Sequence, residues 1–92
     1  MNLLKAAPGV AAGSILGIRP EHLELGAEGW ALTVDGIELL GAERLLYCRL
    51  QDELLIVRIH EEQQPPKVGA TIYAKPRADR LHLFDARTGL RM

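Results

Sequence analysis

Hydrophobic and polar residues alternate along most of this chain with the two-residue period of β-strands, and no window sustains the period of a helix. The clearest pair of runs is Glu43–Leu50 and Glu53–His60, which are separated only by Gln51 and Asp52. A two-residue polar connection between two alternating runs is typical of an antiparallel hairpin. The pattern therefore predicts two paired strands at the centre of the chain.

The longest apolar run, Trp30–Leu40, changes parity halfway. Its apolar residues before and after residues 35–36 fall on one face only if one extra residue is accommodated there. Gly36 suits the unusual backbone of such a β-bulge, and a bulge bends a strand sharply. A long strand that bends at a glycine is how small barrels let one strand serve two sides of the sheet.

Four shorter runs complete the pattern, and turn residues close each of them. The expected strands are Ser14–Arg19, His22–Leu25, Ala70–Lys75 and Leu81–Phe84. Residues 61–69 are polar and contain two adjacent prolines, so we expect a loop there. About seven short strands without a helix predict an all-β barrel or sandwich.

The first 14 residues do not fit this pattern. They are rich in Ala and contain two Gly and one Pro, a composition that suits a connector better than a packed element. We therefore expect a connector over residues 1–14 and one domain over residues 15–92. A length of 92 residues leaves no room for a second domain.

Composition narrows the class of function. The chain is 48% hydrophobic and 4% aromatic, with a formal net charge of −1. This composition is globular, and the charge excludes the strongly basic balance of a dedicated nucleic-acid binder. No apolar stretch approaches the about 20 residues of a membrane span, and the single Cys48 cannot form an internal disulfide. We expect a soluble, cytoplasmic protein.

The charges are unevenly distributed along the chain. Residues 21–62 hold ten acidic and three basic residues, whereas residues 75–92 hold five basic and two acidic ones. Two explanations stay open at this point. The basic tail folds back onto the acidic middle and neutralises it, or the two regions form a docking surface for another chain.

Catalytic motifs are missing from the sequence. A P-loop needs a lysine after its glycines, and none of the three lysines (Lys5, Lys67, Lys75) follows a glycine. The three histidines (His22, His60, His82) lie far apart without a second cysteine, so nothing supports a metal site. No serine, threonine or cysteine lies in a recognisable nucleophile turn. We expect no enzymatic activity from this chain.

Three segments carry a resemblance to a known family. GIRPEHL at residues 17–23, LGAE at residues 40–43 and RLHLFDARTG at residues 80–89 resemble landmark motifs of one regulatory domain. That domain lies at the C-terminus of the ATPases of sugar and glycerol-3-phosphate ABC importers. The order and spacing are similar from Gly17 to the end of the chain, and MNLL at residues 1–4 resembles the segment that opens the region.

The resemblance implies a fold and a set of partners. It implies a small OB-fold-like barrel, the transport-associated (TOBE) domain, attached to a P-loop ATPase. Partners would be a second copy of the chain, the ATPase domain, regulatory proteins and the membrane permease subunits. No nucleic acid is expected. ATP and magnesium would bind only to the nucleotide-binding domain, and the transporter would hold the chain at the inner face of the membrane.

The motifs also suggest site residues. As contact residues we expect Glu38 and Glu43 around the LGAE turn, and His82, Phe84 and Asp85 in the terminal motif. A second set, Arg19, Pro20 and Glu21, flanks the end of a strand and would fix a turn through an ion pair. Alternation directs Phe84 away from Leu83. Phe84 is then either an exposed interface residue or covered by the basic tail.

One departure from the family matters. Only 12 residues separate Leu4 from Gly17, where the family usually carries an extra hairpin. We therefore expect a barrel that is incomplete at its N-terminal edge, and a homodimer, because an uncovered edge invites pairing.

An alternative function is a small-anion (oxyanion) module, as in related transport-associated domains. It would bind the anion through backbone amides and the hydroxyls of Ser14, Thr33 or Thr71, helped by Arg19.

Overall fold

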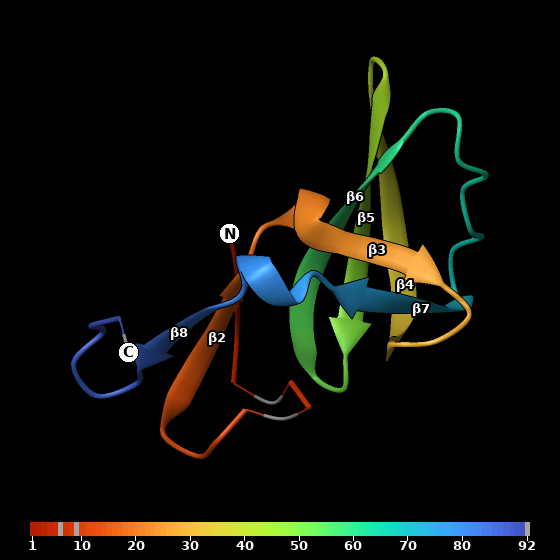
Figure 1. Ribbon diagram of the computed structural model, residues 1–92. Coiled ribbons are helices and arrows are strands. Elements are labelled where there is room, and N and C mark those ends of the chain that lie inside the picture. Colours follow the sequence, from red (N-terminus) through yellow and green to blue (C-terminus); the bar gives the residue numbers. More distant parts are fainter. Residues whose placement is uncertain (6, 9, 92) are drawn as a thin grey trace.

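The computed structural model describes residues 1–5, 7–8 and 10–91. Within these residues the chain forms β-strands and two single-turn 3-10 helices (Figure 1). The strands are β1 (Asn2–Leu4), β2 (Ser14–Ile18), β3 (Leu23–Gly26), β4 (Trp30–Leu40), β5 (Glu43–Leu50), β6 (Glu53–His60), β7 (Thr71–Pro76) and β8 (His82–Asp85). The 3-10 helices are η1 (Pro20–His22) and η2 (Ala78–Arg80).

The larger sheet has five antiparallel strands in the order β3-β7-β4-β5-β6. The predicted hairpin is confirmed, because β5 and β6 have the predicted bounds and pair along their whole length. The predicted bulge is also confirmed, since the register of β4 against β5 shifts between Val34 and Gly36. Before the bulge β4 also pairs with β7, from Trp30 to Thr33, so one bent strand joins both halves of the sheet.

The smaller sheet has three antiparallel strands in the order β1-β2-β8 and lies beside the lower part of the larger one (Figure 1). It brings both ends of the chain together. Residues 2–4 pair with residues 16–18 of β2, and residues 82–85 pair with the other edge of β2. The N-terminal strand was not expected, because residues 1–14 have the composition of a connector.

The core lies between the two sheets, and in β4, β5 and β6 it takes mainly alternate residues. Its fully buried side chains are mostly aliphatic: Leu4, Ile18, Leu32, Val34, Leu46, Val57 and Cys48. Trp30 is 9% exposed and is the one aromatic residue of this cluster within the described residues. Burial of Leu4 in this core shows that β1 is part of the domain.

The two sheets do not close into a continuous barrel, as expected for an incomplete OB-like fold. The outer edges of the larger sheet are β3 and β6, which do not pair with each other. η1 packs against β6 at this opening, and β1 lies beside β6 as well. The seam of the barrel is therefore closed by side chains instead of a strand ladder.

No helix in the described part of the chain has the length and hydrophobicity needed to cross a lipid bilayer.

Candidate functional site

Two of the three sequence motifs meet at Arg58. Glu43, at the start of β5, forms a 3.0 Å ion pair with the Arg58 side chain on β6. Glu21, in η1, lines one hollow together with Glu43, Arg58 and His60. The pKa of Glu21 is below its ordinary value, mainly because its carboxylate accepts a hydrogen bond from its own backbone N–H and also because of the Arg58 charge. The turn of the first motif is thus held against the second.

Arg58 was not among the residues selected from the sequence. It lies on the outward face of β6, opposite Leu45 of β5, and its side chain is 40% exposed. Arg19, which was selected, lines a neighbouring hollow with Pro20, Glu21 and Arg58. The sequence pattern that could have identified Arg58 is a basic residue at an outward position of a strand within an acidic part of the chain.

Glu38 is placed on the outward face of β4 and does not reach Glu43. The hydroxyl of Tyr47 donates a 2.6 Å hydrogen bond to the carboxylate of Glu38. This bond raises the pKa of Tyr47, since it favours the protonated phenol. Near the bulge, Arg49 and Asp35 form a 2.7 Å ion pair on the same face. Polar pairs therefore border the outward side of β4 and β5.

Asp85 ends β8 and builds the turn that follows. Its carboxylate oxygen accepts hydrogen bonds from the backbone N–H groups of Arg87, at 2.7 Å, and Thr88, at 3.2 Å. The backbone of Asp85 also bonds Gly89 and Leu90, so residues 85–90 form a closed loop. The geometry gives the Asp85 side chain a structural task in this turn, as Asp commonly has.

Phe84 lies on the outer face of the three-stranded sheet. It is opposite Ile15 of β2 and half-buried, and its ring covers Gly17. Arg91 forms an isolated bridge with Phe84, so part of the basic tail runs beside it. Phe84 is therefore neither a fully exposed interface residue nor completely covered by the basic tail. His82, two residues before Phe84 on the same strand, is opposite Gly17 and also half-buried.

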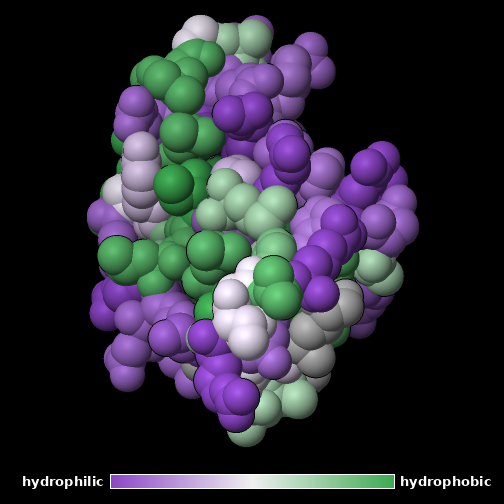
Figure 2. Space-filling view, turned by 90° about the vertical axis from the view of Figure 1, so that its left-hand side faces the viewer, coloured by the Kyte–Doolittle hydropathy of each residue, from purple (hydrophilic) through white to green (hydrophobic). Residues whose placement is uncertain are grey.

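An apolar face runs across the outward sides of both sheets. Tyr47 and Ile56 are cross-strand partners on the outward side of β5 and β6, and Leu54 beside them is 73% exposed. Met1 and Leu3 border the same hollow as Tyr47 and Leu54. Figure 2 shows hydrophobic side chains gathered on this side of the molecule. We define the apolar face as Met1, Leu3, Ile15, Leu40, Leu45, Tyr47, Leu54, Ile56 and Phe84.

Most of the apolar face was missed at the level of sequence. The available signal was that the hairpin of β5 and β6 has apolar residues at outward positions as well as inward ones, as at Leu45 and Leu54. A strand that faces only water on one side carries polar residues there. Exposed and contiguous apolar side chains mark an interaction surface.

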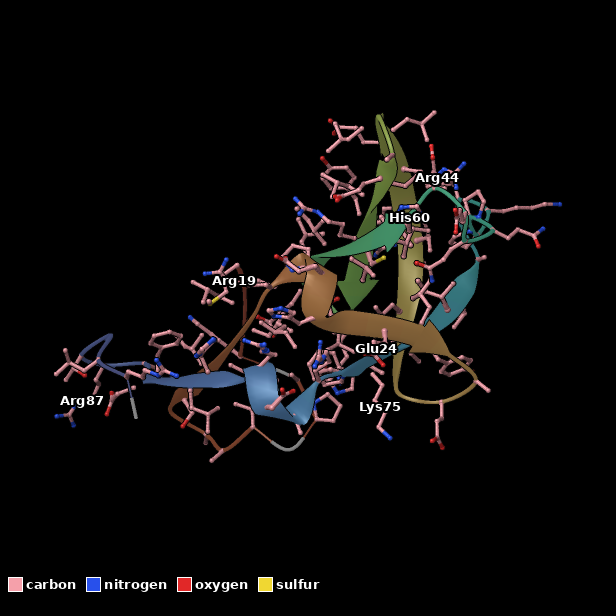
Figure 3. The ribbon with its side chains drawn as sticks, turned by 45° about the horizontal axis from the view of Figure 1, so that its top comes forward. Arg19, Glu24, Arg44, His60, Lys75 and Arg87 are labelled. Carbon is pink, nitrogen blue, oxygen red and sulfur yellow. The ribbon has the colours of Figure 1, made fainter. Side chains whose placement is uncertain are left out.

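The charge asymmetry is only partly cancelled within the molecule. Lys75 and Arg77 pair with Glu28 and Glu24 at 3.9 and 4.0 Å, which joins the start of the basic region to the acidic middle. Arg87 lies at the far end of the molecule (Figure 3). Among the described residues, the ion pairs do not include Arg87 or Arg91. The end of the tail therefore stays basic.

The structure brings together only two of the residues expected to bind a small anion. Thr33 and Thr71 are cross-strand partners in the larger sheet, whereas Ser14 is buried in β2 of the smaller one. The hollow that Arg19 lines contains no hydroxyl side chain.

The remaining candidates for chemistry are the Cys48 thiol and the metal-ligating side chains. Cys48 is buried, and burial raises the pKa of its thiol to about 11, so it is protonated at neutral pH. No group of three or more metal-ligating side chains occurs in the described ranges.

Comparisons with known proteins agree with the motifs. The sequence model of the TOBE domain matches residues 16–84. The chain is 44% identical, over 80 residues, to the sn-glycerol-3-phosphate import ATP-binding protein UgpC of Salmonella typhi. It is 40% identical over 80 residues to the proteins of the same name from Shigella sonnei and Escherichia coli (strain UTI89 / UPEC).

Each of these alignments covers 84% of this chain but 22% of the relative, so the chain spans about a fifth of the length of the curated relatives it matches. The motifs, the incomplete OB-like barrel and the match over most of the sequence agree with one another. The chain belongs to the TOBE domain family.

Proposed function

We propose that this chain is a non-catalytic accessory domain of an ABC importer ATPase that serves the uptake of glycerol-3-phosphate or a carbohydrate. The relatives at 40–44% identity are named as import ATP-binding proteins for sn-glycerol-3-phosphate, which supports this transport class. The domain would work beside the permease subunits, at the cytoplasmic face of the membrane. Regulatory proteins are further expected partners of the assembled importer.

We place no nucleotide chemistry in this chain. Its sequence has no glycine-rich loop followed by a lysine, and its one thiol is buried. In the proposed importer, ATP and magnesium bind to the part of the protein that the relatives carry in addition to this region. The residues of this chain would then contribute contacts with other protein chains.

The apolar face carries this proposal, and its occupant is a second copy of the chain. An isologous pair uses the same patch twice in opposite directions, so each end of the patch meets the other end on the partner. The basic Arg87 and Arg91 lie at the β8 end, and Glu38 and Glu43 lie toward the β4–β5 turn. If the two copies lie in opposite directions, the basic end of one copy would meet the acidic end of the other, on either side of an apolar centre.

The test is the self-association of Leu54→Asp compared with the wild type by sedimentation equilibrium. Leu54 is 73% exposed, so the substitution leaves the core intact. Leu54 would be buried against the partner copy in the proposed dimer, so an unpaired charge in its place should raise the dimer Kd about tenfold or more. Val68→Asp is the matched control, because Val68 is 62% exposed in the loop after β6 and outside the apolar face.

A wild-type chain that stays monomeric, or an equal effect of both substitutions, would refute contact between copies through this face. A permease or regulatory protein would then be its occupant. Phe84→Ala tests the other end of the face, with unchanged self-association removing Phe84 from the contact. It needs a stability measurement beside it, because the Phe84 ring also covers Gly17.

A further inference from the structure

The strand β1 is attached to the larger sheet by side chains alone. The Asn2 amide group donates to the carbonyl oxygen of Ile56 at 2.7 Å and accepts from the N–H of Ile56 at 2.8 Å. One side chain thus takes the place of a neighbouring strand at the open edge of β6. Asn2 is 8% exposed, so this pair of bonds is shielded from water.

A second contact lies at the other end of β1. The backbone N–H of Lys5 donates to both carboxylate oxygens of Glu53, at 2.8 and 2.9 Å. From Asn2 to Lys5 the residue numbers rise, while those of their partners on β6 fall from 56 to 53, so the two segments run antiparallel. They nevertheless belong to different sheets in the described residues. Among the residues that the structure describes, polar attachments of the seam run through Asn2 and Glu53, and Leu4, which is 0% exposed, anchors it in the core.

The larger sheet does not depend on β1 for its own ladder. Its strands pair only with each other, and its buried residues Leu32, Val34, Leu46 and Val57 come from its own strands. β1 is paired with β2 through residues 2–4 and 16–18, so its separation from β6 does not require the ladder of the smaller sheet to break. Separation of β1 from β6 therefore leaves a sheet with most of its contacts intact.

We infer that residues 1–5 form a releasable latch, which opens the seam between β1 and β6 while the larger sheet stays folded. Opening frees the N–H and C=O of Ile56 at the edge of β6, where no other strand of the larger sheet pairs with them. The latch is a property of the fold and does not rest on the proposed function.

Hydrogen exchange of the Ile56 amide measures the latch directly. The Ile56 N–H is bonded to the Asn2 side chain, whereas alternation turns the N–H of Val57 toward β5. In the wild-type chain at low urea concentrations, Ile56 should exchange faster than Val57, with a rate almost independent of urea. That behaviour is the signature of local opening. Equal rates with the same urea dependence would show that the seam opens only by global unfolding and would overturn the proposal.

Asn2→Ala should then raise the Ile56 exchange rate about tenfold and leave the Val57 rate unchanged, since one side-chain bond is worth roughly that factor. Leu3→Ala is the control in the same strand, because Leu3 is 57% exposed and does not take part in the amide pair. An Ile56 rate that Asn2→Ala does not change would remove Asn2 from the latch. The wild-type urea series needs no substitution, so it decides the question even where a variant fails to fold.

Discussion

Gly29 lies against the backbone of Ala74. A Cβ atom at Gly29 would be 2.5 Å from the carbonyl oxygen of Ala74 and 2.7 Å from its carbonyl carbon. Gly29 also has a φ of 127°, where side-chain-bearing residues are rarely found. The turn between β3 and β4 can therefore pass β7 closely only because residue 29 has no side chain.

Gly29→Ala should lower the free energy of unfolding by about 2 to 4 kcal/mol, because it combines backbone strain with a clash against main-chain atoms. Urea unfolding followed by tryptophan fluorescence measures this loss, since Trp30 is the neighbouring residue. Gly26→Ala is the matched control, because a Cβ at Gly26 meets nothing within 4 Å. An alanine at residue 29 as harmless as one at residue 26 would show that the turn can rearrange.

The bond between Tyr47 and Glu38 predicts a stability change in the alkaline range. The pKa of Tyr47 is raised in the folded chain, mainly by its hydrogen bond to Glu38 and also by partial burial and the charge of Glu38. The resulting stabilisation is fully present below pH 10, the ordinary pKa of tyrosine, and is lost as the pH rises through the folded value. Tyr47→Phe should remove this part of the alkaline loss. Urea unfolding across that range measures it.

Tyr73→Phe is the control for Tyr47→Phe, since Tyr73 has similar exposure, 43% against 37%, and a comparable position on a strand. Glu38→Gln should lower the Tyr47 pKa toward its ordinary value, which the absorbance of tyrosinate reports directly. Alkaline titrations that coincide for wild type and Glu38→Gln would mean that the 2.6 Å bond does not persist in solution.

Cys48 should react with thiol reagents only when the chain unfolds. Its side chain is 1% exposed, and burial raises the thiol pKa to about 11, so neither access nor thiolate is available at pH 8. Labelling rates measured in increasing urea should follow the unfolding curve. Rapid labelling in the absence of urea would place Cys48 at a surface and contradict the packing of β5.

The parts of the fold predicted from sequence are those with a local signal. The hairpin of β5 and β6 has an uninterrupted alternation, and the bulge leaves a change of parity next to Gly36. β1 has only three residues, too few to show a period, and it lies in an Ala- and Gly-rich stretch. Its place in the core depends on contacts with residues more than 50 positions away, as between Asn2 and Ile56.

The candidate site was predicted less completely for the same reason. The motifs identified Glu21 and Glu43, but only the packing of η1 on β6 brings both to Arg58. The apolar face is assembled from strands of two sheets. Neither the pairing of β2 with β8 nor the position of β1 beside β6 can be derived from periodicity.

Two substitutions at Asp85 test whether this residue contacts a partner or shapes the turn after β8. Asp85→Ala removes the acceptor for the N–H groups of Arg87 and Thr88, so the exchange of the Arg87 amide should accelerate about tenfold. Asp85→Asn keeps an oxygen at the same place and should retain most of the protection. Hydrogen exchange by NMR distinguishes the two variants.

Measuring the self-association of the same two variants shows whether the dimer depends on the charge of Asp85 or on the turn that Asp85 shapes. If Asp85 acts by shaping the loop of residues 85–90, Asp85→Asn should associate like the wild type, and only Asp85→Ala should weaken the dimer. A dimer that both substitutions weaken equally would instead assign the Asp85 carboxylate to a charged contact with the partner, because the amide preserves the turn but not the charge.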